Sequence, residues 1–112
     1  MKNVAIIIQP NRFDGVREKL IAIGVCGMTI TNVEGFGYEK KQMDVMRGKD
    51  YSVELAPKIK IEIALNEADV DMVVNAVLEE TRTGRLGDGK IFINDLSDVI
   101  RIRTGERKEH AL

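Results

Sequence analysis

The chain has 112 residues, of which 44% are hydrophobic and 31% charged, and its formal net charge is −1 at pH 7. This length and composition predict one soluble globular domain whose core needs no metal or disulfide. The near-neutral charge and the small aromatic content (three Phe, two Tyr, no Trp) argue against nucleic-acid binding. No apolar run is long enough to span a bilayer. The single cysteine and the lack of a signal-peptide pattern predict a reducing, cytoplasmic setting.

The first third of the chain has a strand–helix–strand pattern. Residues 4–8 are a continuous β-branched apolar run, which predicts a strand buried on both faces. Apolar residues recur at helical spacing over 13–23, with Asn11 as the expected N-cap and Gly24 as the expected end. Residues 28–33 alternate and are rich in β-branched side chains, which predicts a second strand.

Residues 35–57 lack a clean periodicity and are mostly polar. A loop of this length inside a compact domain is generally functional or disordered. Met46 and Tyr51 would be exposed apolar groups on it. That pattern is typical of a partner-binding segment, and a mobile loop with incidental apolar residues is the alternative.

The second half repeats the first pattern. Residues 58–65 alternate strictly between apolar and other side chains, which predicts a third strand. Asn66 and Asp69 resemble a capping box before a helix whose apolar stripe covers 70–78. A fourth strand is predicted over 90–93. Two strand–helix–strand units in succession predict an α+β, ferredoxin-like βαββαβ sandwich, with a four-stranded antiparallel sheet and two helices on one face.

The other face of this sheet combines charged residues, such as Lys60 and Glu62, with the apolar run at 4–8. We expect part of that face to pack against other subunits.

Residues 83–90 contain three glycines and end in Lys90. Glycine permits left-handed backbone, and consecutive free N–H groups form an anion-binding concavity. The stretch is not a Walker A loop, because Ile91 stands where Ser or Thr is required. A phosphate cradle and a plain helix-to-strand turn are both compatible with these residues.

Arg101 and Arg103 alternate along a segment that we expect to be extended, so their side chains would share one face. Two guanidinium groups on one face could grip phosphate oxygens, and a solvated edge strand is the alternative. Cys26 is expected to be a packed thiol and His110 a solvated side chain, and this pair cannot make a usual zinc site.

Six blocks occur in a recognisable order and spacing: Gly27-Met28-Thr29, Val33-x-Gly35-Phe36-Gly37, Arg47-Gly48-x-x-Tyr51, residues 57–62, residues 82–92 and residues 101–107. With these blocks, the whole chain resembles the PII family of signal-transduction proteins. The resemblance implies a homotrimer with three nucleotide sites for ATP or ADP in the clefts between neighbouring subunits.

The resemblance also implies individual roles. Residues 82–90 would be the phosphate loop, and the basic segment 101–107 would reach over from the next subunit. The nucleotide-binding residues would be Thr29, Gly35, Phe36, Gly37, Ala64, Gly87, Asp88, Gly89, Lys90, Arg101 and Arg103. Residues 37–55 would be a long flexible loop that docks on a target, usually a membrane transporter or a metabolic enzyme, with Met46, Arg47 and Tyr51 among its contacts.

The chain departs from the family pattern after Gly37, where Tyr38-Glu39 replaces the usual Arg-Gln. The usual Gln helps to hold Mg²⁺ and 2-oxoglutarate, and Lys58 would meet the distal carboxylate of that ligand. Glu39 is a possible Mg²⁺ ligand through MgATP. It also adds a like charge beside a dianion, which costs about 1 kcal/mol at 4 Å in water and about 4 kcal/mol at an effective dielectric of 20. We therefore expect 2-oxoglutarate binding to be weak or absent.

A second departure surrounds Tyr51, the uridylylation target in some family members. Lys49-Asp50-Tyr51-Ser52 differs from the usual Ala-Glu-Tyr-Val, so we expect Tyr51 to be an unmodified contact residue.

The sequence thus predicts a regulatory protein, not an enzyme, because no residue is placed as a general base for water. It would sense the energy state by competitive ATP and ADP binding and control its target through the 37–55 loop. The first alternative is a conventional PII nitrogen sensor that binds MgATP with 2-oxoglutarate and regulates ammonium transport or nitrogen metabolism. The others are a slow nucleotide hydrolase and a ligand-free assembly module. We expect no nucleic-acid partner and no direct membrane insertion, although a transporter partner would recruit the protein to a membrane.

Overall fold

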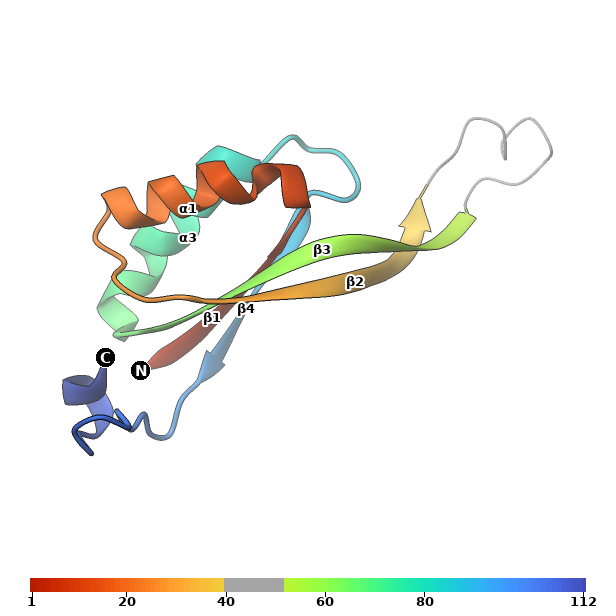
Figure 1. Ribbon diagram of the computed structural model, residues 1–112. Helices are drawn as coiled ribbons and strands as arrows, with labels where there is room; N and C mark the ends of the chain where they lie inside the picture. Colours follow the sequence, from red (N-terminus) through yellow and green to blue (C-terminus); the bar gives the residue numbers. More distant parts are fainter. Residues whose placement is uncertain (40–51) are drawn as a thin grey trace.

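The computed structural model describes residues 1–39 and 52–112, with the side chains of 37–39 and 52–54 excepted. Its main elements are β1 (Lys2–Ile8), α1 (Phe13–Ala22), β2 (Thr29–Glu39), β3 (Ser52–Leu65), α3 (Val70–Thr81) and β4 (Gly89–Asp95). The strands form one antiparallel sheet in the order β2-β3-β1-β4. Both helices cover the same face of that sheet (Figure 1). This arrangement confirms the predicted ferredoxin-like sandwich.

The core lies between the helices and alternate residues of the central strands. Val4 pairs with Ile63 and Ile6 with Ile61, and each of these four side chains is at most 2% exposed. Their partners on the helices are Val16, Leu20, Val73 and Val77, which are also buried. Period-two burial on the strands and period-3.6 burial on the helices explain why the sequence pattern predicted these elements.

The prediction that β1 is buried on both faces holds only in part within one chain. Ala5 is 5% exposed on the face away from the helices, whereas Ile7 on the same face is half-buried. That open face also carries an ion pair between Lys60 Nζ and Glu62 Oε1 at 2.8 Å, and Phe92 is 47% exposed. Its packing against other subunits stays a prediction.

Both predicted helix caps are wrong. Asn11 lies inside a short 3₁₀ turn, Pro10–Arg12, and makes no capping hydrogen bond to α1. Asn66 precedes a similar turn, Glu67–Asp69, and also makes no side-chain cap bond. In each case the backbone closes the turn, for instance Arg12 N to Gln9 O at 3.0 Å, so no side chain is needed.

The apolar stripe of α3 differs from the prediction at its end. Val70, Val73 and Val77 are buried as expected, but Leu78 is 39% exposed. It lies one position past Val77, about 100° further around the helix, so it faces the edge strand β4 and not the centre of the sheet.

The end of α1 is as predicted, since Gly24 adopts a left-handed φ of 101° and donates to Ile21 O at 3.0 Å.

The expected loop is shorter than predicted, because the flanking strands extend into it. β2 continues to Glu39 and β3 begins at Ser52, so residues 37–39 and 52–55 are paired strand. This part of the hairpin projects beyond β1, whose pairing with β3 stops at Ile8 and Ile59. The projecting part of the hairpin has no core to face, so its sequence need not alternate between apolar and polar residues. The lack of alternation therefore wrongly predicted a loop here. Residues 40–51, with Met46, Arg47 and Tyr51, lie outside the described residues.

No helix among the described residues has the length and apolar composition that a membrane span requires.

Candidate functional site

The predicted nucleotide-binding residues fall into two groups at opposite ends of the sheet. Gly89 pairs with Ile8 at one end of β1, and Asp95 pairs with Lys2 at the other. The loop before β4 therefore lies at the first end, together with the projecting β2–β3 hairpin, and the C-terminal segment lies at the second (Figure 1). We call these the loop end and the tail end.

At the loop end, the Asp88 carboxylate closes the glycine loop on itself. Its Oδ2 accepts from Thr83 N at 2.8 Å and from Gly84 N at 3.0 Å, and its Oδ1 accepts from Thr83 Oγ1 at 2.5 Å. Arg85 N in turn donates to Thr83 Oγ1 at 3.2 Å. The hydrogen bond from the Thr83 hydroxyl, followed by those from backbone N–H groups, lowers the pKa of Asp88 below its ordinary value.

The next two N–H groups of the loop are left free. Leu86 N and Gly87 N donate to no other residue in the described part of the chain. Gly84, Gly87 and Gly89 all have left-handed φ angles, of 81°, 91° and 117°. Consecutive free N–H groups in such a turn are suited to an anion, and the choice between a phosphate cradle and a plain turn stays a prediction.

Gly89 is required at its position for a second reason. A Cβ built on it would lie 1.9 Å from the Ile7 carbonyl oxygen. At its first residue, β4 therefore packs so closely against β1 that only glycine fits. The loop ends at Gly89 for this reason.

Two side chains from other elements tie the loop to the sheet. Gln9 Nε2 donates to Gly87 O at 2.9 Å, and Lys58 Nζ donates to the same oxygen at 3.3 Å. Lys58 also passes close to Gly35, since a Cβ there would lie 3.1 Å from Lys58 Cγ. Gly35, Lys58 and Gly87 thus meet at the loop end, and Phe36 beside them is 73% exposed.

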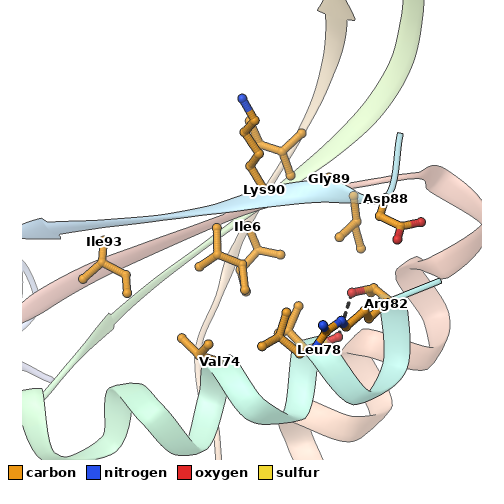
Figure 2. Close-up of a pocket in the computed structure, with 13 residues that line it drawn as sticks. Ile6, Val74, Leu78, Arg82, Asp88, Gly89, Lys90 and Ile93 are labelled. Carbon is orange, nitrogen blue, oxygen red and sulfur yellow. Dashed lines mark hydrogen bonds between the residues drawn. The ribbon is translucent and has the colours of Figure 1, made fainter. Parts of the chain in front are cut away.

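Lys90 presents its ammonium group on the side of the sheet away from α3 (Figure 2). On the α3 side, a separate cavity of about 320 Å³ lies between β4 and α3. Its wall is mainly apolar, with Ile6, Val74, Leu78 and Ile93 in the interior and Arg82 and Asp88 at one end (Figure 2). The apolar cavity and the cationic surface are therefore on opposite sides of the edge strand.

Gly37 and Glu39 lie on the projecting part of β2, where Glu39 pairs with Ser52. The Glu39 side chain is outside the described residues, so its roles toward Mg²⁺ and 2-oxoglutarate stay predictions. Across residues 1–39 and 52–112, no group of three or more His, Cys, Asp or Glu residues is placed to hold a metal ion.

At the tail end, Thr29 and Ala64 line a hollow of about 640 Å³. Cys26 lines the same hollow and is exposed, which corrects the prediction of a packed thiol: the turn after α1 leaves it uncovered. Leu112, at the end of the C-terminal segment, closes one side of the hollow.

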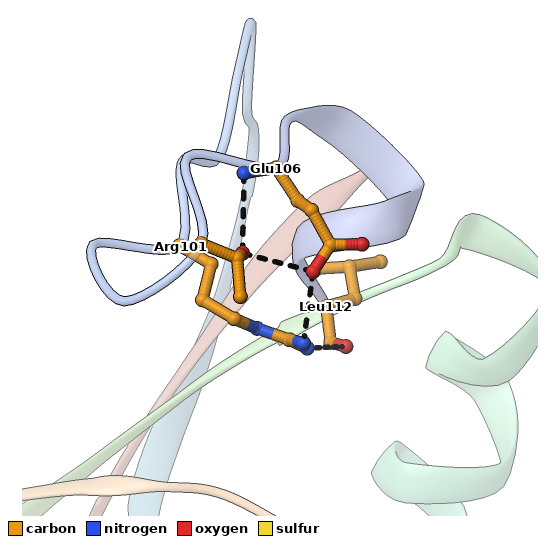
Figure 3. A network of polar contacts seen from close by, with 4 residues as sticks. Arg101, Glu106 and Leu112 are labelled. Atoms are coloured by element: carbon orange, nitrogen blue, oxygen red, sulfur yellow. Dashed lines mark hydrogen bonds and ion pairs between the residues drawn. The ribbon is translucent and has the colours of Figure 1, made fainter.

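Arg101 lies beside this hollow and is held by its own segment. Its Nη2 donates to Leu112 O at 3.0 Å and its Nη1 lies 3.4 Å from Glu106 Oε1 (Figure 3). Thr104 Oγ1 donates to the same Glu106 oxygen at 2.8 Å.

The prediction of an extended Arg101–Arg103 segment is wrong. Residues 102–104 form a turn closed by Arg101 N to Glu106 O at 2.9 Å and Gly105 N to Arg101 O at 2.7 Å. Gly105 has a left-handed φ of 74°, which allows the chain to reverse at this point. Arg103 is exposed on the turn.

Within one chain, the two arginines and the glycine loop therefore cannot hold the same phosphate group. The pair Ala64–Asn3 and the pair Gly89–Ile8 lie five residue steps apart along β1. At about 3.4 Å per residue this is roughly 17 Å.

Sequence reasoning placed Thr83 within the predicted phosphate loop 82–90 but gave it no role of its own, and it missed Gln9. Thr83 had a local signal, because a hydroxyl and a carboxylate flank the glycines at 84 and 87. Gln9 had none, since its contact with Gly87 joins residues 78 positions apart.

Comparison with known proteins places the whole chain among regulatory proteins. The profile of the family described as "Nitrogen regulatory protein P-II" matches residues 1–106. The chain is 46% identical over 112 residues to the "Nitrogen regulatory protein P-II" of Pasteurella multocida (strain Pm70), with 100% of both chains covered. It is 47% identical to the "Nitrogen regulatory protein GlnK" of Escherichia coli (strain K12), again with full coverage of both.

A solved structure, described as "Structure of B. subtilis GlnK", matches with a TM-score of 0.81 and 36% identity, covering 99% of this chain and 97% of that one. These relatives are described as regulators and not as enzymes, in agreement with the prediction.

Proposed function

The chain belongs to the nitrogen regulatory protein P-II family, and from this membership we propose that it is a trimeric regulator that binds ATP and ADP competitively and controls a target protein through residues 37–55. As in its relatives, this function is signal transduction and not catalysis. The target would be a transporter or a metabolic enzyme.

The single observation that carries the nucleotide proposal is the geometry of the glycine loop. Leu86 N and Gly87 N are unpaired among the described residues, and Lys90 places a cation at the start of the next strand. Backbone donors with a nearby ammonium group are well suited to a polyphosphate, which both ATP and ADP carry. Since both would use the same donors, their binding would be mutually exclusive.

The separation of the loop end from the tail end supports the trimer. When two halves of a site lie at opposite ends of one chain, a head-to-tail contact between copies brings them together. Such a contact closes into a ring when its rotation matches the number of subunits. In a ring of three, each site would take Gly87 and Lys90 from one subunit and Arg101 and Arg103 from its neighbour.

The route from the nucleotide to the target is carried by Lys58. It donates to Gly87 O in the phosphate loop and lies on β3, which leads directly into the projecting hairpin. A phosphate that shifts Gly87 would change this bond and the strand pair that carries residues 40–51. A nucleotide-dependent order–disorder change in the 37–55 segment would then bind or release the target.

We propose that 2-oxoglutarate binds weakly or not at all, because Glu39 adds a negative charge where the family pattern has an amide. The conventional nitrogen sensor is the second candidate, and the placement of Lys58 at the loop end favours it. Titration with 2-oxoglutarate at saturating MgATP, on the wild type and on Glu39→Gln, separates the two. Binding gained only in the variant supports the proposal, and tight binding by the wild type favours the conventional sensor.

The nucleotide proposal is tested by calorimetric titration of the purified protein with ADP and with ATP. Saturable binding of both, with each displacing the other, is expected. Lys90→Ala should weaken both, whereas Lys108→Ala, at the tail end, is the charge-matched control. Absence of binding by the wild type would refute the proposal.

A further inference from the structure

We propose that Asp88 is a positioning residue, which keeps the phosphate loop in its binding shape without touching the ligand. We call its contacts with Thr83 and Gly84 the clasp. The inference rests on the proposed nucleotide function, because the clasp matters only if the free N–H groups of the loop receive a phosphate.

The clasp divides the donors of the loop into two sets. The N–H groups of Thr83 and Gly84 go to the Asp88 carboxylate, and the N–H group of Arg85 goes to the Thr83 hydroxyl. The following two, of Leu86 and Gly87, have no partner among the described residues. Internal hydrogen bonds thus satisfy the first three donors, while the next two stay available for an anion.

The Asp88 carboxylate has little left to offer a ligand. Both of its oxygens already accept hydrogen bonds, at 2.5 to 3.0 Å. Its negative charge would repel a phosphate if it faced the ligand directly. In the clasp, donors from within the loop compensate the negative charge of Asp88. The electrostatic repulsion between this carboxylate and a bound phosphate is therefore reduced.

The loop is pinned at a second point, which makes the clasp decisive for its shape. Gly87 O is held by Gln9 and Lys58, so the end of the loop is fixed to the sheet. Its start follows α3 through Arg82 N to Leu78 O at 3.0 Å. Between these two anchors, the clasp is the contact that folds residues 83–88 back on themselves.

A double-mutant cycle on ADP binding tests the inference, with calorimetry on the intact wild type, Asp88→Ala, Thr83→Val and the double variant. If both residues act through the clasp, each single variant lowers the affinity by about tenfold and the double variant is no worse than the singles. Thr83→Ser keeps the hydroxyl and should restore wild-type affinity. Asp95→Ala, which removes an aspartate at the tail end, is the control for net charge.

A direct role of Asp88 on the ligand gives different results. Thr83→Val would then leave the affinity unchanged, and Asp88→Ala would raise it by removing repulsion or lower it only when Mg²⁺ is present. Either outcome overturns the inference while the proposed function stands. If the wild type binds neither nucleotide, the proposed function fails and this inference fails with it.

Amide hydrogen exchange of the unliganded protein supplies a second measurement that needs no ligand. The amides of Thr83 and Gly84 should lose protection in Asp88→Ala, and the amides of the central strands should keep theirs. Unchanged protection of Thr83 and Gly84 would also overturn the inference, since the carboxylate would then not hold them.

Discussion

The loop end and the tail end of the sheet offer a phosphate different chemistry. The loop end presents backbone N–H groups, shaped by left-handed glycines and by the Asp88 carboxylate. The tail end presents guanidinium groups on a turn, with Arg101 held by Glu106 and Leu112. The loop end combines backbone donors with the ammonium groups of Lys58 and Lys90, whereas the tail end is cationic but has no cradle of backbone donors. Under the proposed function, neither end is a complete nucleotide site, so binding should depend on how copies of the chain meet.

The largest expected effect comes from disrupting the backbone of the loop end. Gly89→Ala forces a Cβ against Ile7 O, at a position whose φ is 117°. We expect it to destabilise folding by about 3 kcal/mol and to abolish nucleotide binding. Urea denaturation and ADP titration measure the two effects. Gly27→Ala is the matched control, because a Cβ there meets nothing within 4 Å. A Gly89→Ala protein as stable as the wild type would show that the loop end is less constrained than described.

The next effect comes from removing charge at the tail end without disturbing its fold. Arg103 is exposed on the turn, so Arg103→Ala should leave the melting temperature unchanged and weaken ADP binding by about tenfold or more. Arg107→Ala is the control, because Arg107 is paired with Asp98 Oδ2 at 2.8 Å and is not assigned to the ligand. Equal affinity of Arg103→Ala and the wild type would remove the tail end from the site.

The smallest effect is a pH dependence that distinguishes the two ends. Hydrogen bonds from Thr83 lower the pKa of Asp88, so the clasp is present above the unfolded-state pKa and is lost as pH falls through the lower folded-state value. At the tail end, Lys2 lowers the pKa of Asp95 in the same direction, through a hydrogen bond first and its charge second.

Below about pH 4, the ordinary pKa of an aspartate, the ADP affinity of the wild type should therefore fall faster than that of Asp88→Asn, while Asp95→Asn should follow the wild type. Calorimetry over a pH series measures these slopes. Parallel slopes for the wild type and Asp88→Asn would mean that Asp88 does not control the loop.

The sequence predicted those parts of the fold in which a buried face imposes a period. Residues 58–65 alternate because every second side chain enters the core, and Val73 and Val77 recur because one side of α3 does so. The projecting hairpin at 35–39 has no such face, so its strands were mistaken for loop. The caps failed because a backbone-closed 3₁₀ turn precedes each helix, with Arg12 N donating to Gln9 O before α1 and Asp69 N donating to Asn66 O before α3.

In the candidate site too, features that depend on local backbone conformation could be predicted from the sequence, whereas contacts between distant residues could not. The glycines at 84, 87 and 89 mark the loop in the sequence because their backbone conformation demands them. The location of Arg101 at the other end of the sheet depends on how the strands are ordered, and the pattern R-x-R alone predicted the wrong local geometry. Contacts between distant residues, such as Gln9 with Gly87, leave no periodic trace.

The most direct test of a site shared between subunits is a mixing experiment with two variants that each bind ADP weakly. Lys90→Ala and Arg103→Ala would each be prepared as trimers, shown to bind ADP weakly, then unfolded, mixed in equal amounts and refolded. If one subunit supplies Lys90 and its neighbour supplies Arg103, about one site in three within each mixed trimer, and about a quarter of all sites after random refolding, should contain both native residues and bind ADP with wild-type affinity. If no tight sites form in mixed trimers, the two residues do not meet across an interface, and the account of the loop end and the tail end as halves of one site is contradicted.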